Sequence, residues 1–167
     1  MDLPFVDETF GPDPIDLVEA VIGADHRFVS ERGDDGDLTF SARGSWCEVT
    51  GYFSHREELP AILFTVSFDL RAPKARFNDA ARLVALVNEN LWLGHFDLWS
   101  EDGSVVFRHA VPLIGRSELA AGEIQALLAA AMDAADRFYP AFNFLIWAGK
   151  SPEEAIQSSL FETVGEA

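Results

Sequence analysis

Cysteine is almost absent from this sequence, which has a single one, Cys47, in 167 residues. One thiol excludes a disulfide within the chain and any metal site built from several cysteines. Cationic residues are also scarce, because 12 Lys and Arg are outnumbered by 28 Asp and Glu, for a formal net charge of −16. Phosphate backbones and anionic lipid surfaces both require clustered basic residues, so we expect neither a nucleic acid nor a membrane as a partner.

Long apolar runs are missing as well, so no membrane span is predicted. The first residues, "MDLPFVDETFGPDP", are acidic and lack the basic and apolar regions of a secretory signal, which favours a cytoplasmic protein. About half of the residues are hydrophobic, including 14 Phe and 4 Trp, as in a folded chain. We expect a loosely held arm over residues 1–12 and a single domain over residues 13–167. The acidity suits simple solubility, or a surface that receives a basic segment.

Helical periodicity and capping residues predict four helices. They cover residues 13–23, 74–92, 117–139 and 151–161. Asp13 and Ser151 are expected caps of the first and last helices, and Ser117 of the third. Pro140 is expected to kink or break the third helix before "AFNFLIWAG". In the second helix, Phe77, Ala80, Val84, Val87 and Leu91 form the expected apolar stripe.

Alternating apolar and polar residues predict four strands before the second helix. They cover residues 26–31, 37–43, 46–53 and 61–70. Their short connections imply an antiparallel meander. A hairpin follows the second helix, so the order is α-ββββ-α-ββ-αα. This order predicts an α+β fold, with an antiparallel sheet of about five to six strands and helices packed on one face.

The dipeptide "DG" at residues 102–103 predicts a hairpin with a two-residue loop, because both turn residues should reach positive φ. Such a loop places Asp97 opposite Arg108, as a cross-strand ion pair, and Phe96 opposite His109. Side chains alternate between faces along each strand, and any loop with an even number of residues leaves the faces unchanged.

The same hairpin contains the residues that most resemble an active site. His95 and His109 are expected on opposite faces, which excludes a metal site that uses both. His95 and Asp97 could act as a base and its orienting group, but no serine or cysteine is placed to be the nucleophile. We therefore expect no enzyme activity, and the sequence predicts no cofactor and no metal site.

Aromatic residues at positions that should face water predict a contact surface, because Trp, Tyr and Arg are enriched as interface anchors. Trp46 and Tyr52 are expected on the polar side of their strand, and Trp99 on the polar side of the hairpin. Alternatively, a C-terminal segment such as "FNFLIW" folds over this side and buries them. The candidate interface residues are Trp46, Tyr52, His95, Asp97, Trp99 and Arg108.

The stretch "LVNENLWLGHFDLWSEDGSVVFRHAVPL", the Ala-rich helix after it and "DRFYPAFNFLIWAGKSPEEAI" together resemble the YbjN-domain family of bacterial proteins. The resemblance covers most of the chain after residue 13 and is densest over residues 77–156. The matching positions are structural signatures rather than catalytic residues. They are Asn88, Gly94, Phe96, Arg108, Tyr139, Pro140, Gly149 and residues 152–155.

That family is described as sensory transduction regulators, and the resemblance implies a fold similar to type III secretion chaperones, which are commonly dimeric. It also implies a non-enzymatic role in stress-response or regulatory pathways, with no assigned ligand. We therefore expect a cytoplasmic, homodimeric, chaperone-like module that docks a protein partner or client segment on a helix or on the open sheet face. The alternative is a small-molecule-sensing domain with a pocket between helices and sheet.

Overall fold

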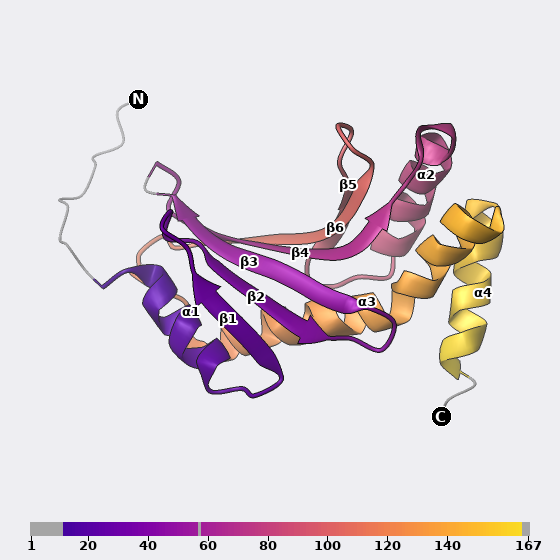
Figure 1. The fold of residues 1–167 in the computed structure, drawn as a ribbon. Helices are drawn as coiled ribbons and strands as arrows, with labels where there is room; N and C mark the ends of the chain where they lie inside the picture. The colour runs from indigo at the N-terminus through magenta and orange to yellow at the C-terminus, as the bar shows by residue number, and fades with distance from the viewer. Residues whose placement is uncertain (1–11, 57, 165–167) are drawn as a thin grey trace.

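The computed structural model describes residues 12–56 and 58–164 and contains a six-stranded antiparallel sheet (Figure 1). The strand order is β1-β2-β3-β4-β6-β5, so the first four strands form the predicted meander and the hairpin is added beyond β4. The predicted arm lies outside the described residues except for Pro12. The strands are β1 Phe28–Arg32, β2 Leu38–Arg43, β3 Glu48–Arg56, β4 Ala61–Arg71, β5 His95–Leu98 and β6 Ser104–Pro112.

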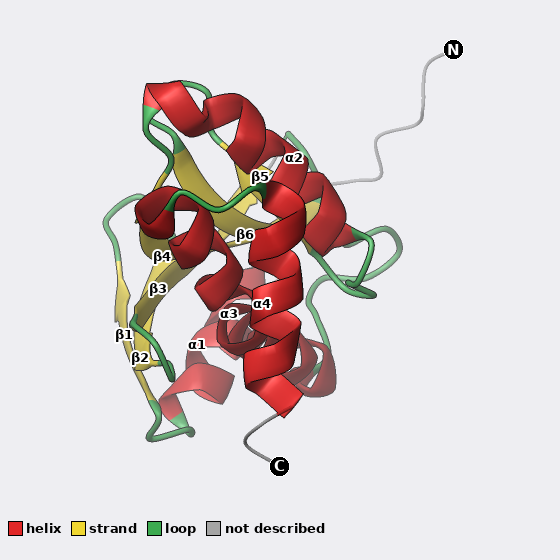
Figure 2. Cartoon of the chain, turned by 90° about the vertical axis from the view of Figure 1, so that its right-hand side faces the viewer, coloured by secondary structure: helices red, strands yellow, loops and turns green. Residues whose placement is uncertain are grey.

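The helices gather on one side of the sheet, which confirms the predicted α+β class and element order (Figure 2). The first helix packs on the first three strands, and the long third helix packs on β4 and on the other three helices. A short 3-10 turn, Lys74–Arg76, precedes the second helix. The helices are α1 Pro14–Gly23, α2 Phe77–Asn88, α3 Ala121–Ala148 and α4 Pro152–Val164.

The predicted caps of α1 and α4 are confirmed. The Asp13 carboxylate accepts a hydrogen bond from the Ile15 N–H at 2.9 Å. The Ser151 hydroxyl accepts one from the Glu154 N–H, and the Glu154 carboxylate accepts one in return from the Ser151 N–H. In α2 the fully buried stripe is Ala80, Leu83 and Val87, and Phe77 is only half-buried.

The expected start of α3 was wrong, and the helix is not broken at Pro140. The helix begins at Ala121 rather than after Ser117, and its N-cap is Ala120. The Glu123 carboxylate accepts from the Ala120 N–H at 2.7 Å, which gives a free N–H at the start of the helix a partner. The helix also continues through Pro140 without a break. Proline lacks the N–H that would bond the carbonyl four residues earlier, at Asp136. The Trp46 indole N–H donates to that carbonyl at 2.9 Å instead, so the carbonyl has a partner.

The core lies between the sheet and the helices, where the apolar side chains of alternating strand residues meet. Phe53 and Phe64 are fully buried, with ring centroids 4.5 Å apart. Phe96 of β5 contacts four other phenylalanine rings from β4, β6 and α3. The short β5 strand is therefore held to the core mainly by one side chain.

The β5–β6 loop differs from the prediction, because it has four residues, Ser100–Gly103, rather than two. Trp99 and Ser104 close it, with the Trp99 N–H donating to the Ser104 carbonyl at 2.9 Å. Only Gly103 has a positive φ there, of 76°. Its carbonyl accepts from the Ala72 N–H at 2.8 Å, and a Cβ at Gly103 would lie 2.2 Å from the Ala72 carbonyl oxygen. A tertiary contact with the end of β4 thus selects the longer loop.

The longer loop shifts the hairpin register by two residues. His95 is opposite Arg108, and Asp97 is opposite Val106, whereas the sequence predicted Asp97 opposite Arg108. Because a shift of two returns each side chain to the same face, the predicted separation of His95 from His109 is confirmed.

Candidate functional site

One side of the sheet carries no helix in the described part of the chain, and we call it the open face (Figure 2). The strand registers place its side chains in two rows that cross the sheet. The first row is Glu31, Thr39, Tyr52, Thr65, Arg108 and His95. The second row is Val29, Ser41, Thr50, Ser67, Val106 and Asp97.

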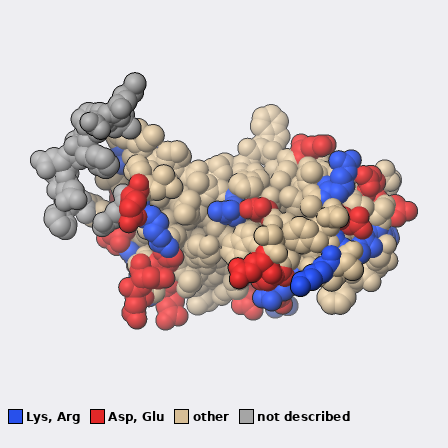
Figure 3. Space-filling model, turned by 90° about the horizontal axis from the view of Figure 1, so that it is seen from above, with Lys and Arg blue, Asp and Glu red and all other residues tan. Residues whose placement is uncertain are grey.

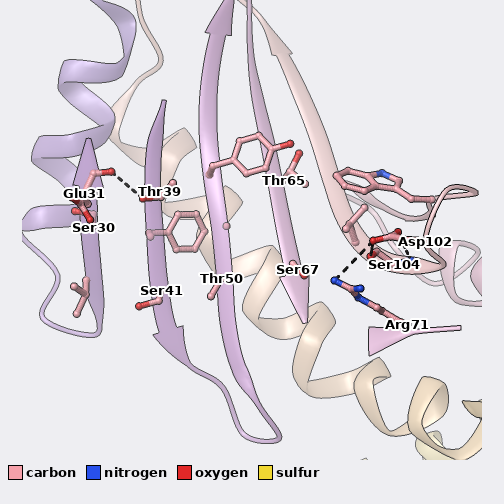
Figure 4. A pocket seen from close by; sticks show the side chains of 16 residues that line it. Ser30, Glu31, Thr39, Ser41, Thr50, Thr65, Ser67, Arg71, Asp102 and Ser104 are labelled. Atoms are coloured by element: carbon pink, nitrogen blue, oxygen red, sulfur yellow. Dashed lines mark hydrogen bonds and ion pairs between the residues drawn. The ribbon is translucent and has the colours of Figure 1, made fainter. Parts of the chain in front are cut away.

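A groove of about 600 Å³ runs over the open face (Figure 4). Hydroxyl-bearing side chains from β2, β3, β4 and β6 line it, and Tyr52 and Trp99 add aromatic surface. The lining hydroxyls other than that of Tyr52 belong to Thr39, Ser41, Thr50, Thr65, Ser67 and Ser104. Such a lining offers hydrogen-bond donors and acceptors together with apolar contact area, which is the mixture found at protein interfaces.

Charged groups lie mainly at the ends of this groove. Glu31 lines the β1 end, and Arg71 and Asp102 line the β6 end, where their charged atoms are 4.0 Å apart. Hydrogen bonds from Ser104 lower the pKa of Asp102, so that carboxyl stays ionised. Seen from above, many charged side chains lie towards the two ends of the molecule, and smaller groups of basic and acidic side chains lie between them (Figure 3).

A β-bulge in β4 brings Arg71 to the groove. The pairing of β4 with β6 shifts between Ser67 and Arg71, and Asp69 in the bulge has a φ of 53°, in the left-handed region. After the bulge Arg71 pairs with Ser104 instead of continuing the earlier register. β4 has two more residues than β6 between these two pairs, and this redirects the end of β4 towards the hairpin loop.

The predicted ion pair between Asp97 and Arg108 is present, at 2.9 Å, but on a diagonal of the ladder rather than directly across. Both side chains are about 40% exposed, so the pair contributes no more than about 1 kcal/mol to stability. The Asp97 carboxylate also accepts from the Leu98 N–H at 2.9 Å. Its oxygens are therefore engaged by Arg108 and the backbone rather than by the imidazole of His95, which argues against the base-and-orienter arrangement.

Trp99 lies at the β6 end of the groove and is 40% exposed. Val106, on the same face, is 2% exposed and lies outside the core under the helices, so neighbouring side chains of the open face cover it. The alternative that "FNFLIW" folds over this face is wrong. These residues form the end of α3, and Phe142 and Leu145 are buried in the core on the other side of the sheet.

Trp46 does not lie on the open face, contrary to expectation. It precedes β3, in the turn after β2, and its indole N–H donates to the Asp136 carbonyl of α3. The neighbouring Ser45 N–H donates to the Asp136 carboxylate at 3.0 Å. Of the six candidate interface residues, the structure places Tyr52, His95, Asp97, Trp99 and Arg108 on or beside the open face, and it places Trp46 against α3.

Cys47 is partly buried against the core. Burial raises the pKa of its thiol, and the carboxylates of Asp136 and Asp69 raise it further. Because the thiolate is the reactive form, this cysteine is a poor nucleophile at neutral pH.

The positions that carry the family resemblance have structural roles at the hairpin. The Asn88 side chain accepts from the Phe96 N–H at 2.7 Å and donates to the Phe96 carbonyl at 3.0 Å. Gly94 has a φ of 73°, and a Cβ there would lie 2.2 Å from the buried Phe107 ring. Gly149 ends α3 in the left-handed conformation.

The hydroxyl residues of the groove were missed as site residues by the sequence reasoning. The signal was present, because Thr39, Ser41, Thr50, Thr65 and Ser67 all occupy the polar positions of predicted strands. Serine and threonine are common on any solvated sheet face, however, and only the pairing of the strands brings these five together.

Within residues 12–56 and 58–164, no three His, Cys, Asp or Glu side chains lie close enough to hold a metal ion. No helix in the same part of the chain is long and apolar enough to cross a bilayer. In comparisons with known proteins, the model of the YbjN family, described as "Putative bacterial sensory transduction regulator", matches residues 14–144. That span contains all six strands and most of α3. The comparison with curated proteins found no match.

Proposed function

Because the chain belongs to the YbjN family, described as bacterial sensory transduction regulators, we propose that it is a regulatory module that binds a segment of a partner protein. The observation that carries this proposal is the groove on the open face, which the described helices leave uncovered. We place the module in the cytoplasm and assign it a chaperone-like, non-enzymatic role, as the sequence predicted.

The groove lining favours a polypeptide as the ligand. Its hydroxyls can pair with the amide groups of a docked segment, and Tyr52 and Trp99 supply large rigid anchors of the kind that dominate interface energies. The ion pair of Asp97 and Arg108 neutralises the hairpin beside the groove, so a ligand needs no large opposite charge there.

The cavities beside the helices are smaller than the groove on the open face. One, of about 460 Å³, lies between the end of β4, the β5–β6 loop and the side chains of Phe77, Ile146 and Trp147, and this volume is within the usual range for small-molecule sites. A cavity among α1, β1 and α3, lined by Phe28, Leu128 and Met132, has about 100 Å³. Small-molecule sites usually measure about 300–1,000 Å³, so this cavity is too small for one. The open face offers several times that volume.

Site-specific photo-crosslinking in cells tests the proposal. A photoreactive residue at Thr50, exposed in the middle of the open face, should capture a protein partner. The same residue at Ala126, exposed on α3, is the matched control and should not capture that partner. Trp99→Ala should reduce the crosslink at Thr50. Equal crosslinking from both positions, or no effect of Trp99→Ala, would contradict binding on the open face.

A further inference from the structure

The sheet has two edge strands, β5 and β1, and they differ in how far their outward backbone groups have hydrogen-bond partners. On the outer side of β5, the Asn88 side-chain amide accepts a hydrogen bond from the Phe96 N–H and donates one to the Phe96 carbonyl. α2 packs beside the same strand. An exposed strand edge is a template for pairing with another chain, and β5 is protected from it by these contacts.

The outer side of β1 has no equivalent closure among the described residues. The Glu31 carbonyl accepts from the Thr39 hydroxyl, and the Gly33 N–H donates to the Asp37 carbonyl, so both groups face β2. Since the direction alternates along a strand, the N–H and carbonyl groups of Ser30 and Arg32 point away from β2. Among the described residues, one backbone hydrogen bond is made on this outer side, from the Phe28 N–H to the Asp25 carbonyl.

β1 also lacks two of the devices that blunt a sheet edge. Its sequence, Phe28–Arg32, contains no proline and no bulge. Its one basic residue, Arg32, is turned beneath the sheet, where it pairs with acidic residues of α1 and its cap, Asp13, Asp16 and Glu19. Val29, in contrast, is 73% exposed on the open face at the strand edge. The edge therefore offers free backbone groups next to an exposed apolar side chain.

We propose that two copies of this chain pair antiparallel through β1, with Ser30 opposite Ser30 of the second copy. This register pairs the outward N–H and carbonyl of each Ser30 with those of the other, and it sets Val29 of each copy beside Glu31 of the other. The sheet then continues from one subunit into its partner. A twofold interface must match itself, and antiparallel pairing of one strand with its copy meets that condition.

The charges along the edge support a second copy as the occupant. Arg27 and Arg43 lie at the end where β1 begins, but Asp25 pairs with Arg27 and Glu48 lies opposite Arg43, so this end is close to neutral. Glu31 and the turn residues 34–35 make the other end acidic. In an antiparallel pair the acidic end of each copy faces this nearly neutral end of the other, whereas parallel pairing would place the two acidic ends together.

The proposed pairing also affects the groove. Val29, Ser30 and Glu31 line its β1 end, so the groove already reaches the strand edge. When two copies join there, their two grooves meet in one surface that is twice as long. The inference does not rest on partner binding, because the pairing uses only the backbone and side chains of β1 and its flanking turns.

Sedimentation equilibrium of the full chain tests the pairing, with Ser30→Pro as the key variant. Proline removes the outward N–H and leaves the bonds of Val29 and Glu31 to β2, so the fold should persist, as circular dichroism can verify. We expect a wild-type dimer, at least tenfold weaker association in Ser30→Pro, and no change in the control Trp147→Ala at the far end of the molecule, where that side chain is 79% exposed. A wild-type monomer, or a dimer that Ser30→Pro leaves intact, would overturn the proposal.

Cysteine crosslinking tests the register independently of any effect on folding. In a Cys47→Ser background, Ser30→Cys should form a disulfide-linked dimer on mild oxidation, because opposite residues in this pairing lie about 5.5 Å apart at Cα, within disulfide range. Thr50→Cys in the same background is the control and should stay monomeric under denaturing conditions. Absence of the Ser30→Cys crosslink, or equal crosslinking at Thr50→Cys, would refute the β1 register.

Discussion

Trp46 and Pro140 form a pair whose energetic coupling can be measured. Pro140 leaves the Asp136 carbonyl of α3 without its helical donor, and the Trp46 indole N–H takes that place at 2.9 Å. Trp46→Phe keeps an aromatic ring and removes the donor. Pro140→Ala restores the backbone N–H, so that the carbonyl no longer depends on Trp46.

The size of the effect follows from the hydrogen bond. A net protein hydrogen bond contributes about 1 kcal/mol, so Trp46→Phe should lower the free energy of unfolding by about that amount. In the Pro140→Ala background the same change should cost close to zero. The coupling energy of the cycle is then about 1 kcal/mol, which is large enough to resolve for residues that share one partner. Pro140→Ala alone should stabilise the chain by less than the roughly 3 kcal/mol that an interior proline costs, because Trp46 already offsets part of the loss.

Urea unfolding followed by circular dichroism is the suitable assay, since Trp46→Phe itself alters the fluorescence. Ser45→Ala serves as a control, because Ser45 contacts Asp136 only through its backbone N–H, which the variant keeps. If Trp46→Phe is equally destabilising with proline and with alanine at position 140, the indole does not substitute for the missing donor, and the reasoning fails.

Three further predictions concern the hairpin and the single thiol. Asn88→Ala loses both hydrogen bonds to Phe96 and should lower the free energy of unfolding by about 2 kcal/mol in urea melts. Asn88→Asp keeps the acceptor for the Phe96 N–H but turns a carboxylate towards the Phe96 carbonyl, so it should be at least as destabilising. Wild-type stability of either variant would contradict the role of Asn88. Gly94→Ala should lose about 2 kcal/mol or more through the positive φ and the clash with Phe107, and a thermal melt within 1 °C of wild type would refute this. The raised pKa of Cys47 leaves less thiolate at neutral pH than a free cysteine has. Maleimide labelling of Cys47 should therefore be slow in the native protein and faster in urea or at higher pH. Equal labelling rates in the native and unfolded protein would contradict the burial of this thiol.

Hairpin faces could be predicted from the sequence more reliably than hairpin pairing. Alternation alone assigns His95, Asp97 and Arg108 to one face and His109 to the other, and the structure agrees. The loop length could not be predicted, because it depends on the contact of Gly103 with Ala72, more than thirty residues away. Local turn propensities contain no information on such a contact.

The placement of Trp46 marks the same limit within the candidate site. Its alternation with Tyr52 predicted a shared face, yet β3 begins only at Glu48, and the turn before it is drawn to α3 by Asp136. The partner that decides its position lies ninety residues further along the chain.

The sequence by itself determined the α+β class, the order of elements, the buried face of each strand and the caps of α1 and α4. These depend on periodicity and on hydrogen bonds within a few residues, which are local properties of the chain. Only the tertiary structure decided the hairpin register, the unbroken α3, the groove of hydroxyl side chains and the difference between the two sheet edges. Each of these depends on a backbone group or side chain finding its partner across the fold, and that pairing is set by packing rather than by local pattern.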